Sequence, residues 1–135
     1  HDRYRRQRQM CIRDSHNLDA LASALRQATS HPLHLETSGI DPLSGRPDWV
    51  TLSPKPHRPP RQELLSRCDE LKVVIHGQTD LDFAQAMAAA VRPSTQLLLQ
   101  PGWGSDQGQQ LAVEHAQRNP RWRLSLQTHK WIGVR

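Results

Sequence analysis

The chain has 135 residues, which allows one domain with a buried core but falls short of the roughly 250 residues of a complete eight-stranded barrel. Its formal charge is +5 at pH 7, and no apolar stretch approaches the roughly 20 residues that a membrane span needs. The basic residues form no stripe with interleaved aromatic residues. We therefore expect a cytoplasmic protein that binds neither nucleic acid nor membrane directly.

Much of the positive charge lies in residues 1–15, which hold five arginines against two aspartates and so supply +3 of the total. This segment has neither helical nor strand periodicity and begins with His rather than Met. Such a segment is typical of translated sequencing-adapter read-through joined to a reading frame, and a disordered basic tail is the alternative. We place the folded part at residues 16–135.

Short apolar runs alternate with segments of helical character along the rest of the chain. The run Leu71–Ile75 is β-branched and nearly continuous in apolar character, as in a strand covered on both faces. After Asp80, apolar residues recur at steps of three and four, which predicts an amphipathic helix. In chain order we expect a helix at 17–29, strands at 33–35 and 49–52, a helix at 61–68, a strand at 71–75, a helix at 80–91, a strand at 97–99, a helix at 105–118 and a strand at 124–126.

This alternation predicts an α/β fold with a parallel sheet and right-handed crossovers. Five parallel strands make an incomplete barrel or an open sheet. Each predicted strand ends at a polar, loop-forming cluster, and α/β proteins bind their ligands beyond the carboxyl ends of the strands. We therefore expect all five clusters on one edge of the sheet, which we call the carboxyl edge.

The first two clusters offer hydroxyl groups and charges. Glu36, Thr37 and Ser38 precede Gly39, which permits close backbone approach to a ligand. The second cluster is Ser53-Pro54-Lys55-Pro56, in which two prolines fix the backbone beside a hydroxyl and a cation. An ordinary turn and a solvated lysine are the alternative readings.

The remaining clusters begin at His76, Gln100 and Gln127. His76 is more typical of a satisfied turn residue than of a ligand. In the cluster Gln100-Pro101-Gly102-Trp103, the amide, the glycine backbone and the indole could surround a flat ligand, and Ser105 is expected to cap the next helix. The last cluster, Gln127–Trp131, is rich in polar and aromatic types for a chain end, and we expect this tail to fold back over the site.

The two cysteines are Cys11, in the leading segment, and Cys68, in a predicted helix. They form no disulfide framework and no CxxC pair, and they are too few to hold an iron–sulfur cluster. Cys68 is expected to be a small buried hydrophobic residue.

The motifs ETSG, SPKP, RCDELKVVIH, LLLQPGWGS and RWRLSLQTHKWIGVR resemble the carboxyl-terminal half of the 7-carboxy-7-deazaguanine synthases. These are radical S-adenosylmethionine enzymes of queuosine biosynthesis, a tRNA modification pathway. The resemblance covers residues 17–135 and implies an incomplete TIM-like (β/α) barrel that acts as a homodimer. It also implies conversion of 6-carboxy-5,6,7,8-tetrahydropterin to 7-carboxy-7-deazaguanine by radical ring contraction with loss of ammonia, which is a carbon–nitrogen lyase reaction.

The resemblance assigns site residues position by position. Thr37 and the terminal Arg135 match positions that contact the pterin substrate, and we add His129 as a substrate-facing polar group. No catalytic residue is assigned. The positions that match S-adenosylmethionine contacts are Gly39, Ser53, Pro54, Lys55, Gln100, Pro101, Gly102 and Trp103.

The family binds a [4Fe-4S] cluster through a CxxxCxxC motif in its amino-terminal half, with a magnesium-contacting residue nearby. Neither region occurs in this sequence, so we expect no metal ligands in this chain, and we expect part of an enzyme that is inactive alone. Two alternatives remain: another radical S-adenosylmethionine enzyme of the activase kind, or a non-catalytic S-adenosylmethionine-binding module. The QTHKWIGVR tail favours the deazaguanine family, and the sequence upstream of residue 16 would separate the three.

Overall fold

The computed structural model describes residues 17–134 and consists of one five-stranded parallel sheet with helices. Residues 1–15 and Arg135, both subjects of sequence-based expectations, lie outside the described residues. The strands follow one another across the sheet in chain order, β1-β2-β3-β4-β5, and the sheet is not closed. They are β1 (His34–Thr37), β2 (Trp49–Leu52), β3 (Glu70–Ile75), β4 (Gln96–Pro101) and β5 (Trp122–Leu124).

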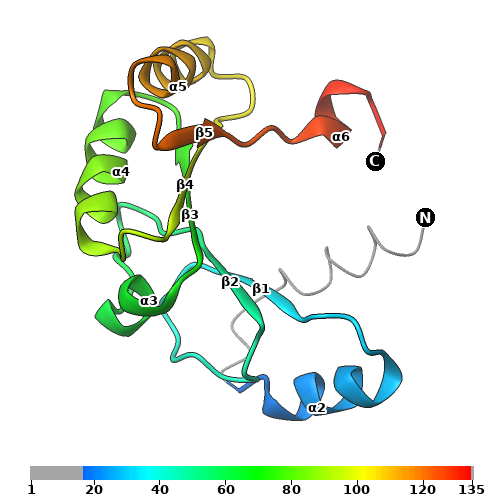
Figure 1. Ribbon diagram of the computed structural model, residues 1–135. Helices are drawn as coiled ribbons and strands as arrows, with labels where there is room; N and C mark the ends of the chain where they lie inside the picture. Colours follow the sequence, from blue (N-terminus) through cyan, green and yellow to red (C-terminus); the bar gives the residue numbers. More distant parts are fainter. Residues whose placement is uncertain (1–16, 135) are drawn as a thin grey trace.

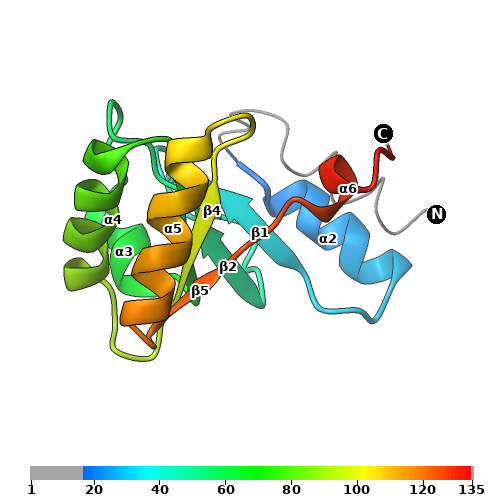
Figure 2. The same cartoon turned by 90° about the horizontal axis from the view of Figure 1, so that it is seen from above.

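Three helices cover one face of the sheet. These are α3 (Gln62–Arg67), α4 (Gln78–Ala90) and α5 (Asp106–Arg118), and Figure 1 shows them together on the convex side of the curved sheet. α2 (Asp19–Ala28) lies near β1, far from α5, and the short α6 (Thr128–Trp131) follows β5. Figure 2, which looks from above, shows the same separation of α3, α4 and α5 from α2 and α6. None of the described helices is long and apolar enough to cross a membrane.

The core lies between the sheet and these three helices. Alternate residues of the central strands point into it, including Val50, Leu71, Val73 and Leu99, and each is at most 1% exposed. The helices contribute Leu64 and Leu65 of α3, Leu81 and Ala84 of α4, and Ala112 of α5. The predicted apolar face of α4 is confirmed, because Met87, Ala88 and Val91 also pack against this core.

Two helix starts show how local sequence fixes these elements. Ser105 caps α5 as expected, because its hydroxyl accepts a hydrogen bond from the Gly108 N–H at 3.0 Å. α4 begins at Gln78, two residues before the predicted start, because the Asp80 carboxylate accepts hydrogen bonds from the N–H groups of His76 and Gly77. Asp80 therefore sits in the first turn of α4, where a carboxylate also complements the helix dipole.

Two sequence-based expectations differ from the structure. β5 begins at Trp122, two residues earlier than predicted, because the Trp122 ring is buried in the core and the Trp122 backbone pairs with that of Leu97. β3 is covered by helices on one face only among the described residues, so that Lys72 and Val74 on the concave face are only partly buried.

Candidate functional site

The carboxyl edge brings the first two predicted clusters together. The Ser53 N–H donates to the Thr37 carbonyl at 2.7 Å, which extends the β1–β2 pairing beyond the end of both strands. The Thr37 hydroxyl accepts a hydrogen bond from the Gly39 N–H at 3.1 Å. The predicted substrate position, Thr37, is therefore hydrogen-bonded to two predicted cofactor positions, Gly39 in the same turn and Ser53 at the end of the neighbouring strand.

Packing within the chain explains why Gly39 is a glycine. Its φ of 81° lies in the left-handed region, and a Cβ atom placed on it would lie 2.6 Å from Leu52 Cδ1 and 2.7 Å from Pro60 Cβ. Pro54 is wholly buried, Ser53 is 7% exposed, and Lys55 is half-buried. Close approach of a ligand to the Gly39 backbone stays a prediction, while the need for glycine follows from Leu52 and Pro60.

The third and fourth clusters are joined in the same way. The Gly102 N–H donates to the Ile75 carbonyl at 2.8 Å, and the Ser105 hydroxyl donates to the His76 carbonyl at 2.9 Å. A Cβ atom on Gly102 would lie 2.2 Å from Nδ1 of His76. The imidazole of His76 therefore occupies the space above the Gly102 backbone, and this packing accounts for the glycine.

Gln100 and Trp103 differ sharply in exposure. Gln100 follows Leu98 on the concave side of β4 and is 9% exposed, whereas Trp103, in the loop after β4, is 58% exposed. Of these two residues only Trp103 lines the pocket described below, and a contact of Gln100 with a ligand stays a prediction.

The tail folds back onto this loop, as expected from its composition. The Trp131 ring meets the Trp103 ring edge-on, with centroids 6.2 Å apart and an interplanar angle of 81°. Lys130 Nζ lies 5.3 Å from the centroid of the same Trp103 ring. The tail is therefore attached to a segment that the resemblance assigns to the cofactor rather than to Thr37.

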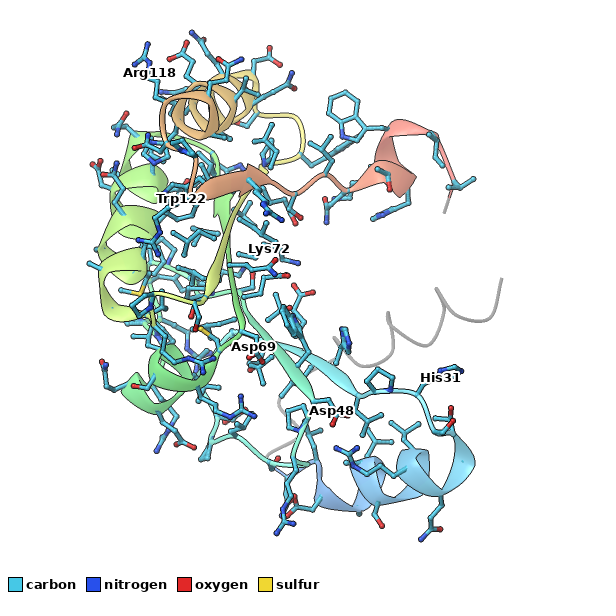
Figure 3. All side chains as sticks on the ribbon, viewed as in Figure 1. His31, Asp48, Asp69, Lys72, Arg118 and Trp122 are labelled. Carbon is cyan, nitrogen blue, oxygen red and sulfur yellow. The ribbon has the colours of Figure 1, made fainter. Side chains whose placement is uncertain are left out.

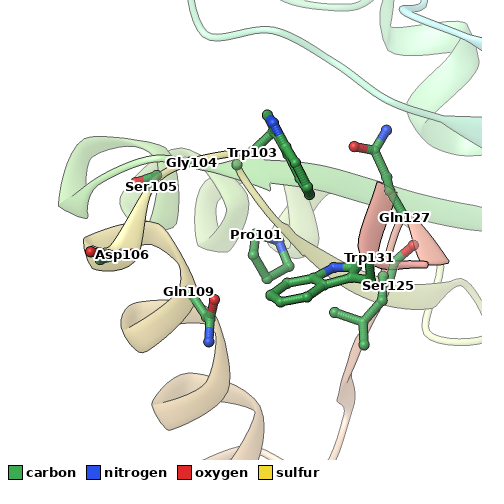
Figure 4. A pocket seen from close by; sticks show the side chains of 11 residues that line it. Pro101, Trp103, Gly104, Ser105, Asp106, Gln109, Ser125, Gln127 and Trp131 are labelled. Atoms are coloured by element: carbon green, nitrogen blue, oxygen red, sulfur yellow. The ribbon is translucent and has the colours of Figure 1, made fainter. Parts of the chain in front are cut away.

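A pocket of about 290 Å³ lies between this loop and the tail. Figure 4 shows Pro101 and Trp103 on the loop side and Trp131 with Ser125 on the other side. The lining residues are Pro101, Gly102, Trp103, Gly104, Ser105, Asp106, Gln109, Ser125, Leu126, Gln127 and Trp131. Gln127 belongs to the fifth predicted cluster, so the pocket unites the fourth and fifth clusters, while the half-buried His129 is not part of its lining.

The two groups of clusters stand at different levels along the strands. Leu52, the last residue of β2, pairs with Leu71, while β3 continues to Ile75, which pairs with Pro101. A difference of four residues along β3 corresponds to about 13 Å at about 3.3 Å per residue. The clusters after β1 and β2 thus lie lower than those after β3 and β4, as the staggered strands of a barrel-like sheet require.

An ion pair that sequence reasoning missed lies on the concave face below this edge. Lys72 Nζ lies 2.6 Å from Glu36 Oε1, so the pair reaches from β3 to β1 across β2. The Lys72 side chain is 16% exposed, and Figure 3 shows it on the concave side of the sheet. The signal available in the sequence was the single charged residue within the apolar run LKVVI. Its partner could not be identified without the pairing of the strands.

Residues 17–134 contain no group of three or more His, Cys, Asp or Glu side chains that could hold a metal ion. Cys68 is a free thiol, wholly buried in the core, and this burial raises its pKa. The thiolate is the form that ligates a metal, and a raised pKa disfavours it. The expectation of a buried hydrophobic Cys68 is confirmed, and this buried thiol does not fit a ligand of an iron–sulfur cluster.

Known proteins resemble this chain over most of its length. It is 47% identical to the 7-carboxy-7-deazaguanine synthase of Prochlorococcus marinus, in an alignment covering 88% of this chain and 63% of the relative. The identity to the synthase of the same name from Synechocystis is 42%, covering 89% of this chain and 57% of the relative. The crystal structure of QueE from Escherichia coli superposes with a TM-score of 0.70 at 27% identity, covering 82% of this chain and 51% of that chain.

No protein-family model matches the chain. The chain spans between about half and two thirds of the length of these relatives. The matched parts cover more than four fifths of this chain.

Proposed function

The chain belongs to the 7-carboxy-7-deazaguanine synthase family, and from this premise we propose that its carboxyl edge is the S-adenosylmethionine-binding and substrate-positioning part of such an enzyme. The complete reaction would convert 6-carboxy-5,6,7,8-tetrahydropterin to 7-carboxy-7-deazaguanine with loss of ammonia. The observation that carries the proposal is the assembly of Pro101, Gly102 and Trp103 with the tail around one pocket at the carboxyl edge, directly after Gln100. The proposal includes a homodimeric state and a cytoplasmic location, both of which rest on sequence-based expectations.

The residues at the carboxyl edge fit the chemistry of S-adenosylmethionine. The nearly buried Gln100 amide can hydrogen-bond an adenine edge, and Trp103 offers an aromatic face. Ser53 and Lys55 offer a hydroxyl and an ammonium group for a ribose or a carboxylate. In this family S-adenosylmethionine supplies the hydrogen-abstracting chemistry, and the residues described here would bind and orient it.

The concave face supplies the place for the pterin. Thr37 ends β1 directly after Glu36, whose carboxylate is held by Lys72. This ion pair fixes the charge and the orientation of the side chains below Thr37. A ligand bound beside Thr37 would therefore contact the paired Glu36 and Lys72 side chains, which carry no net charge together, rather than an unpaired charge.

Cofactor binding can be tested by calorimetric titration of the chain with S-adenosylhomocysteine, a stable analogue. Gln100→Ala should weaken binding by about 1 to 2 kcal/mol, because the partner edge of the ligand loses its hydrogen bond. Gln96→Ala is the matched control, since Gln96 is an exposed residue at the other end of the same strand, and it should leave the affinity unchanged. If Gln100→Ala and Gln96→Ala change the affinity for S-adenosylhomocysteine equally, the ligand does not bind at Gln100.

The reaction itself can be tested by placing residues 17–135 in the corresponding part of the Synechocystis relative and measuring product from the pterin. A folded hybrid that forms 7-carboxy-7-deazaguanine supports the proposal. A folded hybrid that binds S-adenosylhomocysteine but forms no product would favour the non-catalytic binding module. A hybrid that neither binds nor reacts would refute the proposed site.

A further inference from the structure

The tail carries an unusual amount of exposed apolar surface. Among the described residues, the large hydrophobic side chains that are exposed lie mainly in the loop after β4 and in the tail, with Leu21 apart from them. These side chains are Trp103, Leu124, Leu126, Trp131, Ile132 and Val134. Ile132 is the most exposed of them at 72%.

The backbone hydrogen bonds of the tail join tail residues to one another. The Lys130 N–H donates to the Gln127 carbonyl at 2.9 Å, and the Ile132 N–H donates to the Thr128 carbonyl at 3.0 Å. These bonds form the turn of α6 but do not attach it to the sheet. The contacts of Trp131 and Lys130 with the Trp103 ring bridge this gap between the tail and the loop.

The pocket lies at the same junction. One side of it is the loop that carries Trp103, and the other side includes Gln127 and Trp131 of the tail. Its volume of about 290 Å³ is at the lower end of the range for small-molecule sites, which suits one ring system rather than a whole cofactor. An occupant would therefore touch both segments at once.

We propose that Trp131, assisted by Lys130, is a positioning residue that docks the tail onto Trp103 and so holds residues 126–134 at the carboxyl edge. The loop and the tail then behave as one unit, and an occupant of the pocket stabilises both. Because coupling between two segments is reciprocal, loosening either one must loosen the other. The docking is independent of ligand identity, whereas the stabilising effect of an adenosyl ligand rests on the proposed function.

The docking can be tested by hydrogen exchange of the chain without ligand, followed by mass spectrometry. Trp131→Ala should speed exchange in residues 126–134 by about tenfold, since an aromatic pair and a cation–π contact are lost together. Trp131→Phe should restore most of the protection. Ile132→Ala removes a neighbouring exposed apolar side chain and should leave the exchange of residues 126–134 unchanged. In all three variants, the exchange of β3 should equal that of the wild type. If residues 126–134 exchange as slowly in Trp131→Ala as in the wild type, the proposal is overturned.

A double-mutant cycle separates docking from a general loosening of the protein. Trp103→Ala should speed tail exchange as much as Trp131→Ala does, and combining the two should add nothing further, because both remove the same contact. Additive effects would overturn the proposal.

Addition of S-adenosylhomocysteine tests the link to the pocket. We expect slower exchange in both 100–105 and 126–134 for the wild type, and in 100–105 alone for Trp131→Ala. Protection of 100–105 without protection of the wild-type tail would overturn the coupling. In a further outcome, S-adenosylhomocysteine protects neither 100–105 nor 126–134 while the effects of Trp103→Ala and Trp131→Ala are non-additive. That result would contradict the proposed cofactor site but support the docking of the tail.

Discussion

The two sides of the β2–β3 junction are built differently. On one side, β3 and β4 pair through six residues and are backed by α4 and α5, and most of the apolar core lies there. On the other side, β1 and β2 pair through four residues, and their connection contains no helix. The junction itself has two paired positions, Thr51 with Glu70 and Leu52 with Leu71.

Polar contacts replace apolar packing on the β1 side. The Asp48 carboxylate accepts hydrogen bonds from the Leu33 N–H at 2.7 Å and from Arg26 at 3.2 Å, which ties the β1–β2 connection to α2. The Gly45 N–H donates to the Asp19 carboxylate at 2.7 Å. Leu33 and Asp48 directly precede β1 and β2, so these contacts lie at the amino ends of the two strands. The comparison teaches that the β1 side depends in part on charges near the surface, whereas the β3–β4 side depends on an apolar core.

The largest expected difference concerns apolar burial on the two sides. Leu71 is wholly buried in the core, and Leu71→Ala should cost about 2 to 5 kcal/mol of unfolding free energy through lost burial and a cavity. Leu35 on β1 is 8% exposed and lies outside the main core cluster, so Leu35→Ala should cost about 2 kcal/mol or less. Urea denaturation curves measure both values, and a larger loss for Leu35→Ala would reverse the comparison.

The junction should be the next most sensitive place. Asp69 accepts a hydrogen bond from the buried Val50 N–H at 2.9 Å and pairs with Arg92 at 3.3 Å, which connects β2 to the β3 side. Asp69→Ala leaves that N–H without its partner and should cost about 1 to 3 kcal/mol. Glu63→Ala, which removes an exposed ion pair with Arg61, serves as the control and should change stability by less than about 1 kcal/mol. Equal unfolding free energies for the two variants would contradict this role of Asp69.

The smallest expected effect is the pH dependence of the β1 side. The hydrogen bond from the Leu33 N–H, with that from Arg26, lowers the pKa of Asp48 below its usual value of 3.8. A lowered pKa in the folded state means that the stabilisation is complete above 3.8 and is lost as the pH falls through the folded value. Hydrogen exchange of residues 31–37 should therefore accelerate at acidic pH more in the wild type than in Asp48→Asn. If the wild type and Asp48→Asn have the same pH dependence of exchange, the ionised Asp48 carboxylate does not stabilise residues 31–37.

Local patterns of the sequence determined most of the elements and the polar clusters at the strand ends. The first four apolar runs, the buried face of α4, the Ser105 cap and the burial of Cys68 all follow from neighbours a few residues away, and each was predicted correctly. The polar clusters at the strand ends and the folding back of the tail were predicted for the same reason, because composition and periodicity are local properties.

Only the tertiary structure decided the features that depend on residues far apart in the chain. The register of β3 on β2 sets the two levels of the carboxyl edge, the Glu36–Lys72 pair spans three strands, and Trp122 entered β5 because its ring completes the core. The imidazole of His76 likewise packs over Gly102, although the two residues belong to different strand-end clusters. Periodicity along a strand states which residues share a face, but it carries no information on which residue of another strand stands opposite, and that choice is made by packing.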